Sequence, residues 1–341
     1  GRIAGQYFKP RTEKKENRKG ISLPSYRGDG VNSIHFTEKS RKPNPNRLIT
    51  AYHQSASTMN LIRAFEMQGL TNLKQMNFWD KVLFENATLM EKYNTISSKI
   101  KKTIKFINSS NLVNKNLLEK NSNFFTSHEA ILLDYENAFI SSNDILDNYC
   151  GSGHMLWIGD RKRDIKSAHI KFASLIANPI GIKIGPNINI DDLSYLCETL
   201  NPNNELNKLV FIIRLGANKI EEILPKIIQN IKCNGNNVIW FCDPMHGNTI
   251  SAKNGYKTRS FETIIKELKS FFDIHRNENT IPGGVHLELT GEDVTECLGG
   301  IKNIQDNELD KRYETTCDPR LNNEQSLEIA FLISELLIKG D

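Results

Sequence analysis

The chain has 341 residues, of which 38% are hydrophobic and 25% charged, so it can bury a sizeable core. Its 44 Lys and Arg against 40 Asp and Glu leave a net charge of +4, a near balance that argues against a dedicated nucleic-acid-binding protein. No apolar run approaches the ~20 residues that span a bilayer. The six cysteines form no CxxC pair and do not suggest a disulfide scaffold, so a cytoplasmic protein is the simplest expectation.

The first part of the chain is predicted to be loop-rich and then helical. Residues 1–47 are polar and contain turn-like clusters. Apolar residues at roughly helical spacing predict helices over residues 48–68, 79–110 and 128–140.

From residue 155 onward, short apolar runs alternate with amphipathic segments. The runs predicted as buried strands are Met155–Ile158, Ile180–Ile184, Leu209–Ile213, Val238–Phe241 and Val285–Leu289. Helices are predicted near residues 165–176, 191–199, 219–232 and 258–275. A last helix is expected to begin at a cap on Asn322 or Asn323 and to end at Gly340. Strands that alternate with helices indicate βα units and a parallel sheet.

Polar side chains gather at the carboxyl ends of these predicted strands, where a parallel α/β barrel builds its active site. Arg161, Lys183 and Arg214 each lie at or near such an end. A long cation is costly to bury unpaired, and guanidinium groups bind phosphate and carboxylate bidentately. The set indicates a small, multiply anionic substrate. For any one of the three, pairing with a local acid is an equally good interpretation.

His246, Glu288 and Asp318 are candidate metal ligands, each beside Gly, Pro or a strand-like run. A histidine with carboxylates suits Mn, Co, Fe or Zn better than Ca or Mg. The three are scattered in sequence, so spacing alone favours ordinary polar residues over ligands. The segment Lys9-Pro10-Arg11-Thr12 could cradle a phosphate, although charged residues follow it and the pattern alone favours a solvated basic loop.

Several long segments, in order and across nearly the whole chain, resemble the type II 3-deoxy-arabino-heptulosonate-7-phosphate (DAHP) synthase family. They are Arg2–Thr12 (RIAGQYFKPRT), Tyr26–Asn32 (YRGDGVN), Trp157–Arg163 (WIGDRKR), Ala177–Asn187 (ANPIGIKIGPN), Trp240–Thr249 (WFCDPMHGNT), Gly283–Gly300 (GGVHLELTGEDVTECLGG) and Arg312–Asn322 (RYETTCDPRLN). The resemblance implies a (β/α)8 TIM barrel. It also implies condensation of phosphoenolpyruvate with erythrose 4-phosphate, the first step of the shikimate pathway toward chorismate and the aromatic amino acids.

The resemblance also implies roles for individual residues. The residues expected to hold phosphoenolpyruvate are Arg2, Asp160, Arg161, Lys183 and Arg214, with Asp160, Arg161 and Lys183 as the catalytic set. Those expected to contact erythrose 4-phosphate are Lys9, Arg11 and Thr12. His246, Glu288 and Asp318 are expected to bind a divalent metal, Mn²⁺ first, with Co²⁺, Zn²⁺ or Fe²⁺ as alternatives. Asp160 stands where the family commonly has Glu, so its side chain should lie one methylene further back.

One departure concerns the start of the chain. The family's remaining metal ligand is a cysteine in a Gly-Gly-Asp-Cys-like segment, and none of the six cysteines has that context. We therefore expect an N-terminally truncated chain that lacks the first barrel strand and its helix. Two alternatives remain: another phosphoenolpyruvate-dependent aldol-type synthase, or an inactive pseudoenzyme or regulatory partner of the same fold.

The resemblance extends to organisation and partners. Residues 1–341 are expected to form a single barrel domain, with residues 48–140 as a helical region that includes a regulatory or oligomerisation insertion. Aromatic amino acids are candidate effectors, a homo-oligomer is expected, and no nucleic acid or membrane partner is. The expected location is cytoplasmic, or the plastid if the source is a plant or alga.

Overall fold

The computed structural model describes the chain except for residues 4, 10, 12, 69–86, 111–123, 144–145 and 339–341. It divides into two compact units. The helical unit comprises Gly1 and Tyr52–Phe125, and the core unit comprises Arg2–Ala51 and Thr126–Asp341. Among the described residues, no helix is long and apolar enough to cross a membrane. The assignment of residues 48–140 as an insertion in a single domain stays a prediction.

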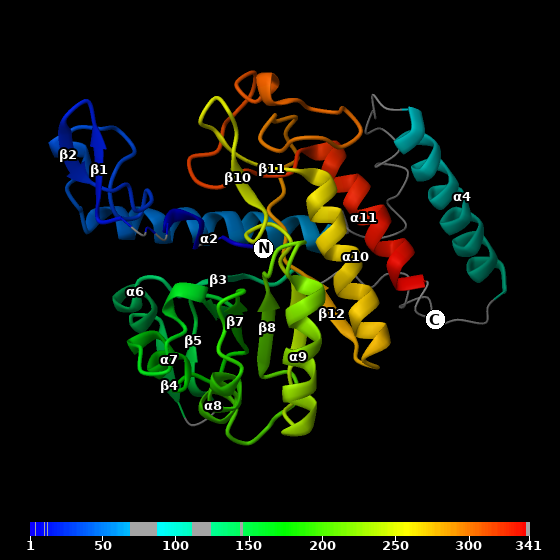
Figure 1. Cartoon of the computed structure of the whole chain (residues 1–341), viewed down its shortest axis with the longest axis horizontal. Helices are drawn as coiled ribbons and strands as arrows, with labels where there is room; N and C mark the ends of the chain where they lie inside the picture. The colour runs from blue at the N-terminus through cyan, green and yellow to red at the C-terminus, as the bar shows by residue number, and fades with distance from the viewer. Residues whose placement is uncertain are drawn as a thin grey trace. The chain divides into compact units, whose positions relative to one another are not determined.

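A six-stranded parallel sheet is the centre of the core unit (Figure 1). Its strands follow one another in chain order across the sheet, so every link between neighbours runs between parallel strands. They are β3 (Ser127–Glu129), β6 (Met155–Ile158), β7 (Ile180–Ile184), β8 (Leu209–Ile213), β9 (Ile239–Cys242) and β12 (Pro282–Val285). The predicted mixed α/β class with a parallel sheet is confirmed.

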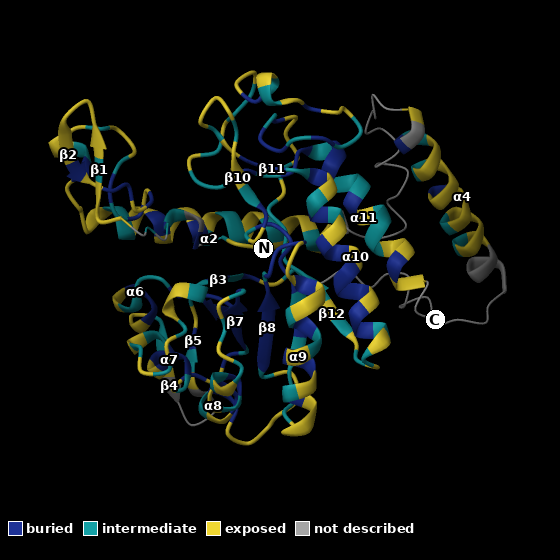
Figure 2. Cartoon of the chain, in the orientation of Figure 1, coloured by how far each residue is buried: buried dark blue, intermediate teal, exposed yellow. Residues whose placement is uncertain are grey.

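The middle strands are the most deeply buried part of the sheet. Every residue of β7 and β8 is buried, and Figure 2 shows β8 buried along its length. Strands covered on both faces read as continuous apolar runs, which is why the sequence predicted them to the residue. The polar exception is Lys183, which pairs with Ile212 of β8 in the register.

Helices connect successive strands of the sheet. They are α7 (Ala168–Ala173), α8 (Asp191–Leu200), α9 (Ile220–Cys233) and α10 (Phe261–Asn277). Each buries an apolar side and exposes a polar one, as α9 shows in Figure 2. The final helix, α11 (Asn323–Ile338), packs against α10. It is capped as predicted, because Asn322 Oδ1 accepts a hydrogen bond from the Gln325 amide at 2.9 Å.

Outside the sheet, the core unit contains short elements. These are η1 (Gly5–Tyr7), α1 (Glu38–Arg41), η3 (Asp160–Lys162), α6 (Leu133–Asn137), η4 (Asp306–Glu308) and three hairpins: β1–β2 (Lys15–Arg18, Ile21–Pro24), β4–β5 (Ile140–Asn143, Leu146–Cys150) and β10–β11 (Thr249–Ser251, Lys257–Arg259). The helical unit contains most of α2 (Asn46–Met67) and all of α4 (Ala87–Ser110). The expected helix over residues 79–110 is present from residue 87, and residues 79–86 lie outside the described part.

Three sequence predictions of local structure were wrong. The segment 128–140 is not one helix but contains strand β3, helix α6 and the start of β4. Short apolar runs do not by themselves separate a buried strand from a helix. The predicted strand Val285–Leu289 is instead β12, which ends at Val285, so residues 286–289 follow the strand. The start of the predicted helix 258–275 belongs to β11, and Ser260 caps α10.

Candidate functional site

The candidate site lies at the carboxyl ends of the parallel strands. Lys183 is near the end of β7, Arg214 directly follows β8, and Asp243 directly follows β9. Side chains that follow neighbouring parallel strands meet at one edge of the sheet. The structure therefore brings together residues that are far apart in sequence, all within the core unit.

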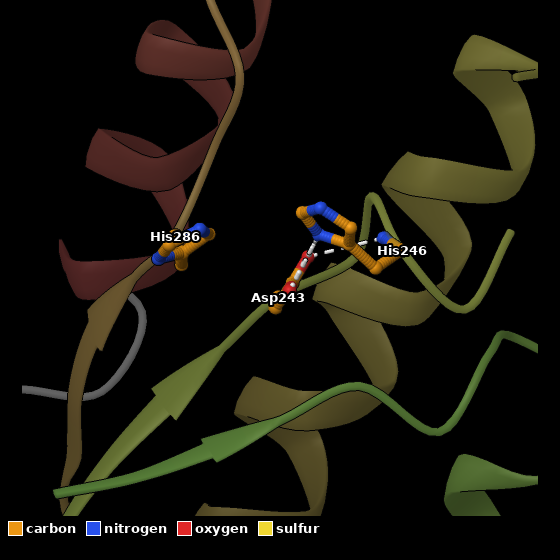
Figure 3. A group of neighbouring side chains, drawn as sticks. All are labelled: Asp243, His246 and His286. Carbon is orange, nitrogen blue, oxygen red and sulfur yellow. Dashed lines mark hydrogen bonds and ion pairs between the residues drawn. The ribbon is translucent and has the colours of Figure 1, made fainter. Parts of the chain in front are cut away.

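Asp243 is a fully buried acid at this edge and accepts several hydrogen bonds, of which Figure 3 shows those from His246. Its Oδ1 accepts from the amides of Met245 and His246, each at 3.1 Å. Its Oδ2 lies 2.8 Å from Nδ1 of His246 and also accepts from the ammonium of Lys183. Burial alone would raise the pKa of the Asp243 carboxyl, but His246 and Lys183 bring it well below its usual value. Asp243 is therefore a carboxylate.

His246, Glu288 and Asp318 form a compact set of possible ligands. One ligand atom from each lies within 4.8 Å of the others. Nε2 of His246 is 3.7 Å from Oε1 of Glu288. Burial would raise the pKa of Asp318, but the charges of Lys257 and His246 lower it to about 2. The structure thus brings the three predicted metal ligands close together, and Asp318 is ionised.

Strand β11 supplies cationic partners to the two carboxylates of this set. Arg259 is fully buried and donates to Oε2 of Glu288 at 2.6 Å, to the carbonyl of Pro319 and to Thr249 Oγ1. Lys257, two residues earlier, lies 3.3 Å from Oδ1 of Asp318. Burial would lower the pKa of Arg259, but Glu288 raises it. The guanidinium fixes one oxygen of Glu288 and leaves the other facing His246.

Asp160 and Arg214 are directly paired on the neighbouring strand ends. Oδ2 of Asp160 accepts from Arg214 at 3.0 Å, and its Oδ1 accepts from Arg163 at 2.9 Å and from the Gly185 amide at 3.0 Å. The other terminal nitrogen of Arg214 donates to the carbonyl of His246 at 2.8 Å. The Nε of Arg214 is buried without a hydrogen-bond partner, which is unusual for a guanidinium donor. This unpartnered donor is a place where an anion could bind.

Glu129, at the end of β3, lies among the remaining cations. Burial raises the pKa of its carboxyl, and the charges of Lys183, Arg161, His246 and Arg2 oppose that rise. These four groups therefore lie within electrostatic range of Glu129. Arg161 is exposed and, with Asp160, lines an open pocket of about 470 Å³. The structure therefore brings Arg2, Arg161, Lys183 and Arg214 to one region.

Two of the predicted erythrose 4-phosphate residues, Lys9 and Arg11, lie near the carboxylate set. Burial lowers the pKa of Lys9, while the nearby charges of Cys317, Glu288 and Asp318 raise it. Arg11 donates to the carbonyl of Tyr26 at 2.7 Å. Thr12 lies outside the described residues. Lys9 and Arg11, the described members of this segment, are thus partly buried and not freely solvated.

Two loops of the site pack so closely that they require glycine. Gly216 follows Arg214 with a φ of +83°, which side-chain-bearing residues rarely adopt. A Cβ added to Gly247, next to His246, would lie 2.5 Å from the Gly216 amide nitrogen. Glycine at both positions allows Arg214 and His246 to approach.

A buried glutamate holds the loop that carries Asp318. Glu296 is fully buried and accepts hydrogen bonds from the amides of Glu314, Thr315 and Arg320 at 2.8–3.2 Å. The Arg320 guanidinium adds two more, at 2.9 and 2.6 Å. This pairing fixes both ends of the segment 314–320 and thereby the position of Asp318.

Sequence reasoning missed four residues that the structure places in the site: Glu129, Asp243, Lys257 and Arg259. Asp243 belongs to the segment DPMHGNT, but it received no role there. Glu129 and Arg259 fell inside segments predicted as helices, which hid their position at a strand end. Lys257 has no signal in the sequence, because only the hairpin brings it to Asp318.

Comparison with known proteins identifies relatives over nearly the whole chain. A family described as the class-II DAHP synthetase family matches residues 1–334. A phospho-2-dehydro-3-deoxyheptonate aldolase of Streptomyces coelicolor is 46% identical over 337 residues, covering 98% of this chain and 74% of the relative. A protein of the same name from Mycolicibacterium smegmatis is 42% identical over 342 residues, covering 98% and 73%.

Among solved structures, a truncated DAHP synthase from Thermotoga maritima is similar at a TM-score of 0.36 and 13% identity, covering 62% of this chain and 65% of that one. A similarity at this level does not by itself establish a fold. The family match and the sequence relatives establish the family. The chain belongs to the class-II DAHP synthetase family.

Proposed function

We propose that this chain acts as a 3-deoxy-7-phosphoheptulonate synthase, a transferase that condenses phosphoenolpyruvate with erythrose 4-phosphate and water to DAHP and phosphate. The proposal depends mainly on one observation: cationic side chains and a group of possible metal ligands lie together at one edge of the parallel sheet. Arg214 and Lys183 supply the cations, and the set of His246, Glu288 and Asp318 lies beside them. Two anionic substrates need such a site.

A divalent metal fits the donor set. His246 offers one ring nitrogen, and Glu288 and Asp318 each offer a carboxylate oxygen, all within 4.8 Å of one another. One nitrogen and two oxygens suit Mn²⁺, Co²⁺, Fe²⁺ or Zn²⁺, and we propose Mn²⁺ first. When bound there, the metal would supply Lewis-acid polarisation of the aldehyde oxygen of erythrose 4-phosphate.

Phosphoenolpyruvate is held by the cations around Glu129 and Asp160. We assign Lys183 and Arg214 to its anionic groups because both lie at strand ends and Arg214 Nε has no hydrogen-bond partner. Arg161 and Arg2 lie close enough to Glu129 to affect its pKa. Fixed cations stabilise phosphate and carboxylate without reorganisation during the reaction. Asp160 holds Arg214 and Arg163 in place, and we propose that it also faces the attacking water.

Erythrose 4-phosphate is assigned to the segment that contains Lys9, Arg11 and Thr12. Lys9 is within electrostatic range of Glu288 and Asp318, so a sugar phosphate bound there would have its aldehyde near the metal set. Carbon 3 of phosphoenolpyruvate attacks that aldehyde carbon, water adds at carbon 2, and the phosphate leaves. Holding both substrates in reacting geometry lowers the entropic cost of their encounter.

We further propose that the sheet belongs to a (β/α)8 barrel. In support, six parallel strands follow each other in chain order, with a helix in each of the four connections from β6 to β12. A helical insertion within residues 48–140, aromatic amino-acid effectors, a homo-oligomer and a cytoplasmic location remain proposals on the family resemblance.

The test is phosphoenolpyruvate consumption by the full-length protein with erythrose 4-phosphate and Mn²⁺, before and after chelation, because a truncated chain can be inactive for that reason alone. We expect consumption that stops with chelator and returns with added metal. A folded, metal-loaded protein that consumes no phosphoenolpyruvate would instead support the pseudoenzyme alternative. A panel of other phosphosugars separates DAHP synthesis from a related aldol-type synthase.

A further inference from the structure

The described residues contain a second group of possible metal ligands, Asp243, His246 and His286, which shares His246 with the first group (Figure 3). The ligand atoms of these three also lie within 4.8 Å of one another. This group is already neutralised by a cation, because the Lys183 ammonium donates a hydrogen bond to Oδ2 of Asp243. The same oxygen lies 2.8 Å from Nδ1 of His246. This second group is therefore an internal ion pair and not a second metal site.

The two nitrogens of His246 face different acids. Nδ1 lies 2.8 Å from Asp243, while Nε2 lies 3.7 Å from Glu288. Asp243 already accepts hydrogen bonds from the Lys183 ammonium and from two backbone amides, so its oxygens act as acceptors and Nδ1 donates the proton. Nε2 is then unprotonated and lies 3.7 Å from Oε1 of Glu288, on the side where a metal would be held. The partner of one imidazole nitrogen commonly sets the metal-binding role of the other.

Lys183 depends on the same carboxylate. It is the polar residue within the buried strand β7, and its side chain is only 6% exposed. An ammonium buried to this extent needs an anionic partner, and Asp243 supplies it. Asp243 thus touches one residue assigned to phosphoenolpyruvate and one assigned to the metal.

We propose that Asp243 is a positioning residue that couples the two halves of the site: it directs Nε2 of His246 toward the metal and holds Lys183 toward phosphoenolpyruvate. This inference rests on the proposed function for the role of Lys183. A purely structural role is the competing explanation, since Oδ1 of Asp243 also accepts two amides of its own turn.

Asp243→Asn separates the two explanations. The amide keeps an oxygen for the turn but presents NH2 to Lys183 and His246, both of which are donors. Nδ1 would then have to accept, so the proton moves to Nε2, where it blocks metal binding. We expect the Mn²⁺ dissociation constant of the metal-stripped chain to rise roughly 10- to 100-fold. We also expect KM for phosphoenolpyruvate to rise about tenfold, with a smaller change for erythrose 4-phosphate.

Glu136→Gln is the matched control. Glu136 is an equally buried acid, 1% exposed, which bonds His128 at 2.9 Å and Ser152 at 2.5 Å. The substitution is chemically the same but touches neither Lys183 nor His246. We expect it to lower thermal stability while it leaves the Mn²⁺ dissociation constant within about twofold. Equal losses of Mn²⁺ affinity in both variants would overturn the inference, as would an Asp243→Asn variant that binds both ligands normally.

A measurement on the unsubstituted chain covers the case in which Asp243→Asn does not fold. Nitrogen-15 NMR of histidine-labelled chain loaded with Zn²⁺, assigned with a His246→Gln variant, should show a proton on Nδ1 and the metal on Nε2. Metal on Nδ1 would overturn the inference. Both the NMR and the Mn²⁺ titration are independent of turnover, so full-length protein without synthase activity would refute the proposed function while leaving the Asp243–His246 relation open to test.

Discussion

At the scale of single residues, the site depends on charges that are buried and paired. Arg214 spans Asp160 and the carbonyl of His246, and Arg259 spans Glu288 and Pro319. Removing one partner from a buried pair leaves an uncompensated charge, which costs more than the pair itself contributes. Substitutions in the site should therefore affect function through charge and geometry together.

Arg214→Ala should nearly abolish turnover, because it removes the guanidinium whose Nε has no partner within the described chain. We expect kcat/KM for phosphoenolpyruvate to fall at least roughly 100-fold, measured by steady-state kinetics. Lys226→Ala is the control, since Lys226 forms an exposed pair with Glu222 on α9 and should change little. Turnover at the normal rate in the Arg214 variant would remove this residue from the substrate site.

His246→Ala should lower metal content without unfolding the chain. The imidazole is partly exposed, so its loss leaves no large cavity, but it supplies one of three ligand atoms. Bound Mn²⁺ measured after dialysis should fall by roughly tenfold or more, while the unfolding temperature of the metal-free protein changes little. His169→Ala, a partly buried histidine outside the set, should keep its metal. Full occupancy in the His246 variant contradicts the assignment.

At the scale of elements, strands bring the site residues to one edge and loops fix their final positions. The ends of β7, β8 and β9 carry Lys183, Arg214 and Asp243. Asp318 has no strand beneath it and depends on the loop 314–320, which is bound to Glu296. A ligand on a loop is only as well placed as the contacts that hold that loop.

Glu296→Gln should loosen this loop. The substitution removes the charge that faces Arg320, whose side chain is 30% exposed. We expect the free energy of unfolding in urea to fall by about 2–3 kcal/mol, and Mn²⁺ affinity to fall with it because Asp318 is no longer fixed. Glu292→Gln, which disturbs an exposed pair with Arg312, should change neither quantity measurably. If the Glu296 variant is destabilised but keeps its Mn²⁺ affinity, the loop does not position Asp318 for metal binding.

At the scale of the whole molecule, one buried acid links helix α10 to two loops of the site. Oε1 of Glu267 accepts from the Gly216 amide at 2.8 Å, and its Oε2 accepts from Asn248 at 2.6 Å. Burial raises the pKa of this carboxyl to about 7. The folded chain therefore binds a proton there that the unfolded chain releases near its ordinary pKa of 4.5.

The contribution of protonated Glu267 to stability should be complete below about pH 4.5 and lost as pH rises to about 7. Over that range, the stability of the metal-free chain relative to its Glu267→Gln variant should fall by roughly 3 kcal/mol. Urea unfolding of both proteins at several pH values measures this. If the unfolding free energies of the two proteins change with pH in parallel, Glu267 keeps an ordinary pKa in the folded chain.

The sequence by itself determined the elements whose signal is local. The apolar runs at β6, β7 and β8 were predicted to the residue, because strands covered on both faces contain little else. A cap at Asn322 or Asn323 was predicted from residue type, and the structure shows that Asn322 is the one that satisfies a helix amide. The family was also recognisable from long segments that keep their order, and the relatives confirm it.

Only the tertiary structure decided which residues meet. Nothing local in Lys257, Arg259 or Glu129 shows that they face the candidate ligands, because hairpin and strand pairing bring them there. The same holds for Asp243. Its sequence neighbours indicate a turn, but they do not show that it pairs with Lys183, 60 residues earlier. Contacts between distant segments depend on how strands pair and loops pack, and no periodicity in the chain records that.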